Sequence, residues 1–183
     1  MNNLHRKLTF VFDLDNTLIK TNMANNLAYK DAVKRVLKLD LPITNKVRLT
    51  REKLCAVLAP LSSEDYYEVI ENKEKIFPTY IGKTSLNKSL VSILKTLYLN
   101  GCETILLTNS HKQRALQLCS YYNIGQYFYS FFFNEESHPD KYTQLTENGY
   151  DLNSIILFEN DIHSMLCAKK SGIPMENIIK VKF

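Results

Sequence analysis

The sequence lacks the features that would place it outside the ordinary globular proteins. It contains no internal repeat, no low-complexity segment and no composition typical of disorder. No apolar run approaches the ~18 residues that a membrane-spanning helix requires. The net charge is only +4, and the lysines and arginines are mostly scattered along the chain. We therefore expect neither a nucleic acid nor a membrane as the partner of this protein.

Paired cysteines are also absent. None of the four cysteines stands in a CxxC pair, so a structural zinc site is not expected. They fall in apolar segments, where free, buried thiols are predicted: Cys55, Cys102, Cys119 and Cys167. Residues 1–7 do not show a signal-peptide pattern, and we expect a location in the reducing cytoplasm.

What the sequence does contain is enough apolar material for a core, at 45% hydrophobic residues in 183. Five short continuous apolar runs are typical of buried parallel strands. They are residues 8–12, 104–107, 129–133, 155–158 and 178–181. Helical patterns lie between them at residues 86–99, 112–122, 141–146 and 162–170, each followed by a glycine expected as a left-handed C-cap. This alternation predicts an α/β fold with a Rossmann-like parallel sheet.

The stretch from residue 21 to residue 82 breaks this alternation. It has no clear strand, and its first glycine is Gly82. The pattern favours helices over about residues 23–39, 48–58 and 63–76, with proline-marked turns between them. We therefore expect an α/β core made of residues 1–20 and 83–183, and an all-helical domain of residues 21–82 inserted after the first strand.

Polar residues follow the predicted strands where each one ends. Asp13 and Asp15 follow the first strand, and residues 108–110, 134–136 and 159–161 follow the next three. Ligands of open parallel sheets bind at this edge. Two carboxylates at i and i+2 point to one side and repel each other unless a cation or a shared proton relieves the repulsion. The pattern predicts a metal-assisted site, and Mg²⁺ suits oxygen ligands and phosphate chemistry.

The segment Asp13-Leu14-Asp15-Asn16-Thr17 follows an apolar strand and has the form Asp-x-Asp-x-Thr. It resembles the first motif of the haloacid dehalogenase-like superfamily. Residues 105–109 end in Thr-Asn and resemble the second motif. Residues 157–160, with the Ala168 and Gly172 that follow, resemble the fourth, and the helical insert stands where this family places its C1-type cap. The resemblance covers essentially the whole chain.

The resemblance implies a Mg²⁺-dependent phosphatase that acts on a small phosphorylated metabolite through an aspartyl phosphate. Asp13 would be the nucleophile and a metal ligand, and Asp15 the general acid/base with its backbone carbonyl on the metal. Thr108 would bind the phosphoryl group, with Asn109 and Ser110 also at the substrate. Asp15 favours phosphoryl chemistry, because the dehalogenase branch lacks a carboxylate there. The alternatives are a phosphomutase or nucleotidase on the same core, or a module that binds a phosphorylated ligand without turnover.

Two positions depart from the family pattern. The third motif normally supplies a lysine; here Lys141 is favoured for that role and His138 is the alternative. In the fourth motif Asn160 stands where a metal-binding aspartate is usual, and Glu159 and Asp161 flank it as alternatives. An asparagine offers a carbonyl oxygen to Mg²⁺ but no charge. The sequence specifies neither the substrate nor the oligomeric state.

Overall fold

The computed structural model describes residues 8–42, 47–134 and 140–183. The described chain forms two compact units. One unit is built from the segment that ends at Ile19 together with Leu86–Phe183, and the other is Lys20–Ser85. The first unit contains the parallel sheet, and the second is helical.

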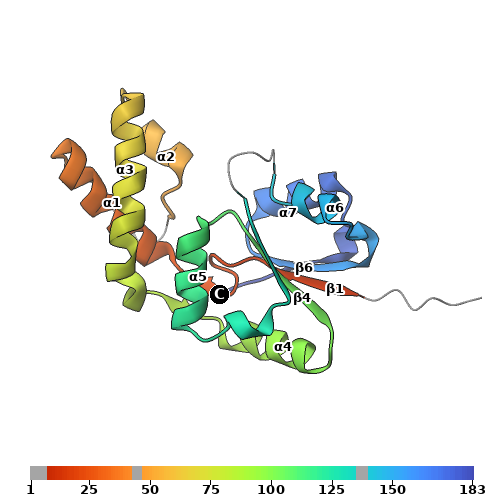
Figure 1. The fold of residues 1–183 in the computed structure, drawn as a ribbon. Helices are drawn as coiled ribbons and strands as arrows, with labels where there is room; N and C mark the ends of the chain where they lie inside the picture. Colours follow the sequence, from red (N-terminus) through yellow and green to blue (C-terminus); the bar gives the residue numbers. More distant parts are fainter. Residues whose placement is uncertain (1–7, 43–46, 135–139) are drawn as a thin grey trace, which may run out of the picture. The chain divides into compact units, whose positions relative to one another are not determined.

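Five parallel strands form the sheet of the first unit, in the order β5-β4-β1-β6-β7. The strands are β1 (Thr9–Phe12), β4 (Glu103–Thr108), β5 (Ser130–Phe133), β6 (Ile155–Glu159) and β7 (Ile178–Lys180). Every pairing in the sheet is parallel, and β1 lies at its centre between β4 and β6 (Figure 1). The five predicted strands are confirmed, each within two residues of its expected limits.

In the described residues of this unit, four helices cover the two sides of the sheet. They are α4 (Lys88–Leu99), α5 (Lys112–Tyr121), α6 (Thr143–Glu147) and α7 (Ile162–Ser171). Helices α6 and α7 pack on one side, in a core that includes Val11, Leu107 and Leu157 of the strands and Leu145 and Ala168 of the helices. Helices α4 and α5 lie on the opposite side (Figure 1). The predicted α/β, Rossmann-like fold is therefore confirmed.

Three of the four predicted glycine caps adopt the expected conformation. Gly101, Gly149 and Gly172 have φ angles of 73°, 79° and 113°, in the region that side chains disfavour. The prediction is wrong at Gly125, which begins a 3₁₀ turn, η2 (Gly125–Tyr127). After α5 the left-handed residue is instead Asn123, with φ 52°, because asparagine tolerates this conformation better than other residues with a side chain.

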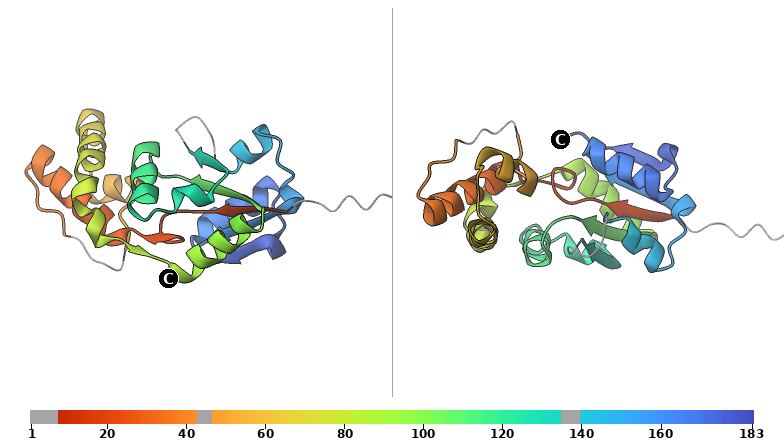
Figure 2. Two further views of the ribbon diagram at one scale, coloured as in Figure 1. Left: turned by 60° about the horizontal axis from the view of Figure 1, so that its bottom comes forward. Right: turned by 90° about the horizontal axis from the view of Figure 1, so that it is seen from above.

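The described part of the second unit contains the helices α1 (Asn22–Leu37), α2 (Arg51–Val57) and α3 (Ser63–Ile76), followed by a 3₁₀ segment, η1 (Phe77–Lys83). Helices α1 and α3 run side by side (Figure 2). Their shared core contains Tyr29, Ala32, Val33 and Val69, and α2 adds Leu54. Ser62 caps α3 by accepting the Asp65 N–H at 3.0 Å.

Two further strands were not predicted. β2 (Ile19–Lys20) and β3 (Ser85–Leu86) form a separate two-stranded sheet. Strands of two residues show no periodicity from which to predict them. None of the helices in the described part of the chain combines the length and the apolar character needed to cross a membrane.

The four cysteines are free thiols, as predicted, but they are not all buried. Cys119 is buried, Cys102 and Cys167 are half-buried, and Cys55 is exposed. The prediction of burial is wrong for Cys55: among the described side chains of the seven-residue helix α2, Leu54 is buried and Cys55 is exposed.

Candidate active site

The ends of three neighbouring strands bring the predicted site residues to one edge of the sheet. Asp13 directly follows β1, Thr108 is the last residue of β4, and Glu159 is the last residue of β6. The Asp13 N–H donates to the carbonyl of Phe158 at 3.0 Å, which extends the β1–β6 pairing to Asp13. The backbone of Asp13 is therefore fixed by the sheet.

A tight loop after Asp13 turns Thr17 back toward it. The carbonyl of Leu14 accepts the N–H groups of Leu18 at 3.1 Å and of Ile19 at 3.0 Å, and Asn16 has a φ of 60°. Thr17 Oγ1 lies 3.0 Å from Asp13 Oδ2 and 3.0 Å from Asn160 Oδ1. One hydroxyl thus brings together oxygens from the loops after β1 and β6.

Lys141 binds two buried carboxylates at once. Its Nζ lies 2.7 Å from Asp13 Oδ1 and 2.7 Å from Glu159 Oε2. The Lys141 side chain is 2% exposed and that of Glu159 1%. Lys141 was expected in the first turn of a helix, but it lies in the turn before α6, which begins at Thr143. The alternative residue, His138, lies outside the described residues.

The charges of this cluster do not balance. Burial, reinforced by the charge of Glu159 and opposed by Lys141, raises the pKa of Asp13 to about 7. Burial disfavours the charged ammonium, but Asp13 and Glu159 outweigh it and raise the pKa of Lys141 well above its ordinary value. Two carboxylates share one ammonium, so the cluster carries an excess negative charge when both are ionised.

Glu159 is turned into the protein rather than toward an open site. Its Oε1 accepts the backbone N–H groups of Asn160 at 2.9 Å and Asp161 at 3.1 Å. Its Oε2 accepts from Lys141 and, at 3.2 Å, from the hydroxyl of Tyr142. Glu159 therefore stabilises the loop after β6 and fixes the position of the Lys141 ammonium group by hydrogen bonds.

Asp161 has a different structural task. Its Oδ2 accepts the N–H of Ser164 at 2.8 Å, which makes Asp161 the N-cap of α7. Of the three candidates at this strand end, it is Asn160 that shares a hydroxyl with Asp13.

A second polar cluster surrounds Asp15. Ser110 Oγ donates to Asp15 Oδ2. Arg114, on α5, donates from Nη2 to Ser110 Oγ at 2.7 Å, and the same Nη2 lies 3.9 Å from Asp15 Oδ2. Arg114 is buried, and sequence reasoning missed it. A signal was present: Arg114, Ala115, Leu118 and Cys119 have the spacing of one buried helix face.

The remaining predicted residues lie at the end of β4. Thr108 is buried, and its Oγ1 accepts the N–H of Ser110 at 3.1 Å. Asn109 is exposed and accepts from Asn134 Nδ2 at 3.0 Å. The structure thus brings Asp13, Thr17, Lys141 and Asn160 together; the catalytic and binding roles of the site residues stay predictions.

The oxygen donors near Asp13 fit a hard divalent cation. The described residues hold no group of three or more His, Cys, Asp or Glu side chains suited to a metal ion. The candidate donors are instead the Asp13 carboxylate, the Asp15 carbonyl and the Asn160 amide oxygen. Mg²⁺ commonly binds through one or two carboxylates plus the phosphate of its substrate, and the excess negative charge beside Asp13 favours a cation.

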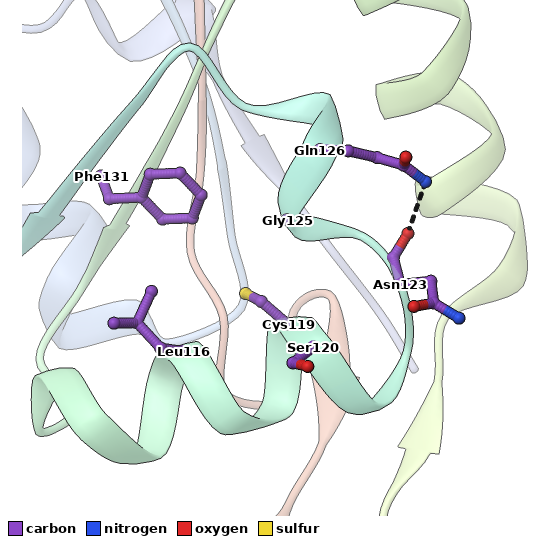
Figure 3. Close-up of a pocket in the computed structure, with 7 residues that line it drawn as sticks. All are labelled: Leu116, Cys119, Ser120, Asn123, Gly125, Gln126 and Phe131. Atoms are coloured by element: carbon purple, nitrogen blue, oxygen red, sulfur yellow. Dashed lines mark hydrogen bonds between the residues drawn. The ribbon is translucent and has the colours of Figure 1, made fainter.

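A surface pocket of about 280 Å³ lies elsewhere on the first unit (Figure 3). Leu116, Cys119 and Ser120 of α5 line one side, and Phe131 of β5 and the turn around Gly125 line the other. None of the predicted site residues lines this pocket, so it lies apart from the candidate active site.

The fold and the site together define a class of protein. A sequence model of the haloacid dehalogenase-like hydrolases matches residues 10–178, which is nearly the whole chain. The chain therefore belongs to that family and is a hydrolase. A comparison with curated proteins found no match to the sequence.

Solved structures share this fold. CbbY from Rhodobacter sphaeroides, in complex with phosphate, is 15% identical with a TM-score of 0.78 over 96% of this chain and 86% of that one. A haloacid dehalogenase-like hydrolase from Streptococcus pneumoniae is 17% identical with a TM-score of 0.75, over 93% and 83%. A predicted phosphoglycolate phosphatase from Haemophilus somnus is 16% identical with a TM-score of 0.70, over 98% and 86%. At these identities the likeness concerns the fold.

Proposed function

We propose that the protein is a Mg²⁺-dependent phosphatase that hydrolyses a small phosphorylated metabolite, with Asp13 as the nucleophile. The observation that carries this proposal is the fixed Asp13 carboxylate. Lys141 holds Oδ1 at 2.7 Å, and Thr17 Oγ1 lies 3.0 Å from Oδ2. A carboxylate held at both oxygens is oriented for attack, and the nearby ammonium offsets its repulsion from phosphate oxygens.

The first half-reaction transfers the phosphoryl group to the protein. A carboxylate oxygen of Asp13 forms a bond to phosphorus as the bond from phosphorus to the leaving oxygen breaks. Asp15 gives its proton to that leaving oxygen, which departs as an alcohol. In the second half-reaction Asp15 takes a proton from water and the water oxygen bonds to phosphorus. The bond from phosphorus to the Asp13 oxygen breaks, which gives the Asp13 carboxylate and inorganic phosphate.

Two other residues are suited to stabilise the phosphoryl group. The hydroxyl of Thr108 accepts the Ser110 N–H, so its own hydrogen is directed to a different acceptor, for which we propose a phosphoryl oxygen. Lys141 supplies positive charge beside Asp13. When bound, Mg²⁺ would neutralise phosphate charge, held by Asp13, the carbonyl of Asp15 and Asn160.

The helical unit, Lys20–Ser85, is proposed to act as the cap that selects the leaving group. Caps of this kind exclude water from the reaction and make contacts specific to the substrate. The phosphatases among the solved structures of this fold support a phosphorylated small molecule as the substrate class. A cytoplasmic location is part of the same proposal.

The test is phosphate release from p-nitrophenyl phosphate, with Mg²⁺ and with a chelator, by the wild type and by Asp13→Asn. We expect release that requires Mg²⁺ and falls at least ~10³-fold in the variant, because the nucleophile is lost. Equal activity of the two proteins would overturn the assignment of Asp13.

Asn160 supports a second candidate, a module that binds a phosphorylated ligand without turnover. An uncharged residue in place of a carboxylate weakens the attraction for Mg²⁺. This candidate predicts tight binding of a phosphorylated ligand with no phosphate released over hours, which the same assay distinguishes from turnover.

A further inference from the structure

The phosphatase mechanism gives no task to Arg114, although burying a guanidinium is costly unless it is well paired. The Arg114 side chain is 9% exposed and comes from the first turn of α5. It lies on the buried face of that helix with Ala115, Leu118 and Cys119, where an apolar residue would be the ordinary choice. Its neighbour Lys112, by contrast, is exposed.

Arg114 is linked to the proposed general acid, Asp15, by hydrogen bonds through Ser110. Its Nη2 donates to Ser110 Oγ at 2.7 Å, and Ser110 Oγ in turn donates to Asp15 Oδ2. A serine hydroxyl has only one hydrogen. Because that hydrogen is given to Asp15, the Ser110 side chain cannot also donate to a phosphoryl oxygen in this arrangement. These contacts favour a role for Ser110 in orienting the Asp15 carboxyl group over its predicted role in binding substrate.

The same guanidinium also reaches the carboxylate directly. Arg114 Nη2 lies 3.9 Å from Asp15 Oδ2, the oxygen that accepts from Ser110. Oδ2 is thus held from two directions by groups that come from the end of β4 and from α5. Contacts to Oδ2 from two directions give the Asp15 carboxyl group a defined orientation.

We propose that Arg114 is a positioning residue for Asp15, acting through Ser110 to orient the carboxyl group that protonates the leaving oxygen. The inference rests on the proposed phosphatase function. It extends that function by assigning a chain of three residues, Arg114, Ser110 and Asp15, to the proton-transfer step alone.

The effect of Arg114 should therefore depend on the leaving group. Phenoxide is a basic leaving group that needs a proton, whereas p-nitrophenoxide leaves readily without one. The ratio kcat/KM reports the steps up to phosphoryl transfer from the ester, so it isolates proton donation by Asp15 from the later hydrolysis.

The experiment compares kcat/KM for phenyl phosphate and p-nitrophenyl phosphate, with Mg²⁺, in the wild type, Arg114→Met and Ser110→Ala. We expect both variants to lose on the order of 10- to 100-fold on phenyl phosphate and less than ~3-fold on p-nitrophenyl phosphate. Arg114→Lys should recover part of the loss. Lys112→Met removes a positive charge from the same helix at an exposed position and should leave both values unchanged.

Asp15→Asn separates this inference from the function on which it rests. If Asp15→Asn shows the leaving-group effect while Arg114→Met and Ser110→Ala lose equally on both esters, or lose nothing, the positioning role is wrong and the phosphatase function stands. A wild type inactive on both esters overturns the function and the inference together. If Arg114→Met does not fold, Ser110→Ala, which deletes a single oxygen, decides between these outcomes.

Discussion

At the scale of single residues, the site depends on one ammonium shared by two buried carboxylates. Lys141 lies 2.7 Å from both Asp13 and Glu159, and all three side chains are at most 9% exposed. Such a cluster is stable only while it is complete, because removal of one partner leaves uncompensated charge in the interior. Lys141 is therefore expected to support the fold as well as the chemistry.

Replacing Lys141 with methionine should lower the free energy of unfolding by about 3–5 kcal/mol, because Asp13 and Glu159 would remain buried without a cation. The double variant with Glu159→Gln should recover part of the loss. Urea denaturation measures both. Lys75→Met is the control: its ion pair with Glu71 is also 2.7 Å long but exposed, and its loss should change stability by less than ~1 kcal/mol. A Lys141→Met protein as stable as the wild type would contradict the cluster.

Asn160 should limit the affinity for Mg²⁺ in the absence of a phosphate ligand. With Asn160, the proposed ligands include one carboxylate, from Asp13. Asn160→Asp adds a second and should lower the Kd of Mg²⁺ on the order of tenfold, measured by calorimetry on the protein alone.

The control for Asn160 is Asp161→Asn. Asparagine caps helices as well as aspartate does, so α7 should keep its cap, and Mg²⁺ affinity should not change. Loss of Mg²⁺ binding in Asp161→Asn, with no gain in Asn160→Asp, would make Asp161 the metal ligand.

At the scale of helices and strands, the sequence was informative wherever an element is buried and regular. The strands were predictable because buried parallel strands are continuous apolar runs, and the capping glycines because few residues tolerate a positive φ. Helix α6 begins two residues later than expected, because the Leu145 N–H bonds to the carbonyl of Tyr142 at 3.0 Å, with the i→i+3 spacing of a turn. Asp140 accepts the N–H groups of Tyr142 at 2.7 Å and Thr143 at 3.2 Å, as a capping residue does. A periodic pattern does not distinguish such a first turn from a regular α-helical one.

The C-cap of α7 offers a test at this scale. Gly172 has φ 113°, and a Cβ added there would lie 3.3 Å from Leu152 Cδ1. Gly172→Ala should lower the free energy of unfolding by roughly 1–2 kcal/mol, through backbone strain and this close contact. Gly101→Ala is the matched control, since φ is 73° and nothing lies within 4 Å of its Cβ; it should cost less. Urea denaturation that ranks the two variants in the opposite order would contradict this reading of the cap.

At the scale of the whole molecule, the predicted site was incomplete because the roles of its missing members follow from side-chain contacts that the sequence does not specify. Asp13 and Thr108 lie at strand ends, which the topology brings to one edge of the sheet, and Lys141 lies in the turn before α6. The contact of Tyr142 with Glu159 is known only from the structure. The helical spacing of Arg114 indicates that it is buried, but its contact with Ser110 is likewise known only from the structure. The exposure of Cys55 and the burial of Cys119 likewise follow from packing rather than from local composition.

The difference between these cysteines predicts how the intact protein reacts with thiol reagents. Burial raises the pKa of Cys119 to about 12, so near pH 8 almost none of it is the reactive thiolate. Cys55 is exposed and should react with Ellman's reagent in the fast phase, whereas Cys119 should react only on unfolding. In Cys55→Ser, the fast phase of the reaction with Ellman's reagent should be smaller by one thiol per protein molecule. Rapid labelling of Cys119 in the folded protein, located by peptide mass spectrometry, would contradict its burial.

The central claim is that Asp13 carries the phosphoryl group during turnover, and mass spectrometry of the quenched reaction tests it most directly. Asp15→Asn should still accept the phosphoryl group from p-nitrophenyl phosphate with Mg²⁺ but hydrolyse it slowly, because its general base is missing. After acid quenching, we predict one phosphoryl group on Asp13, and none when Asp13→Asn is added to the same protein. The account would be contradicted by three results together. The wild type would release phosphate, the quenched Asp15→Asn protein would carry no phosphoryl group on Asp13, and Asp13→Asn would be fully active.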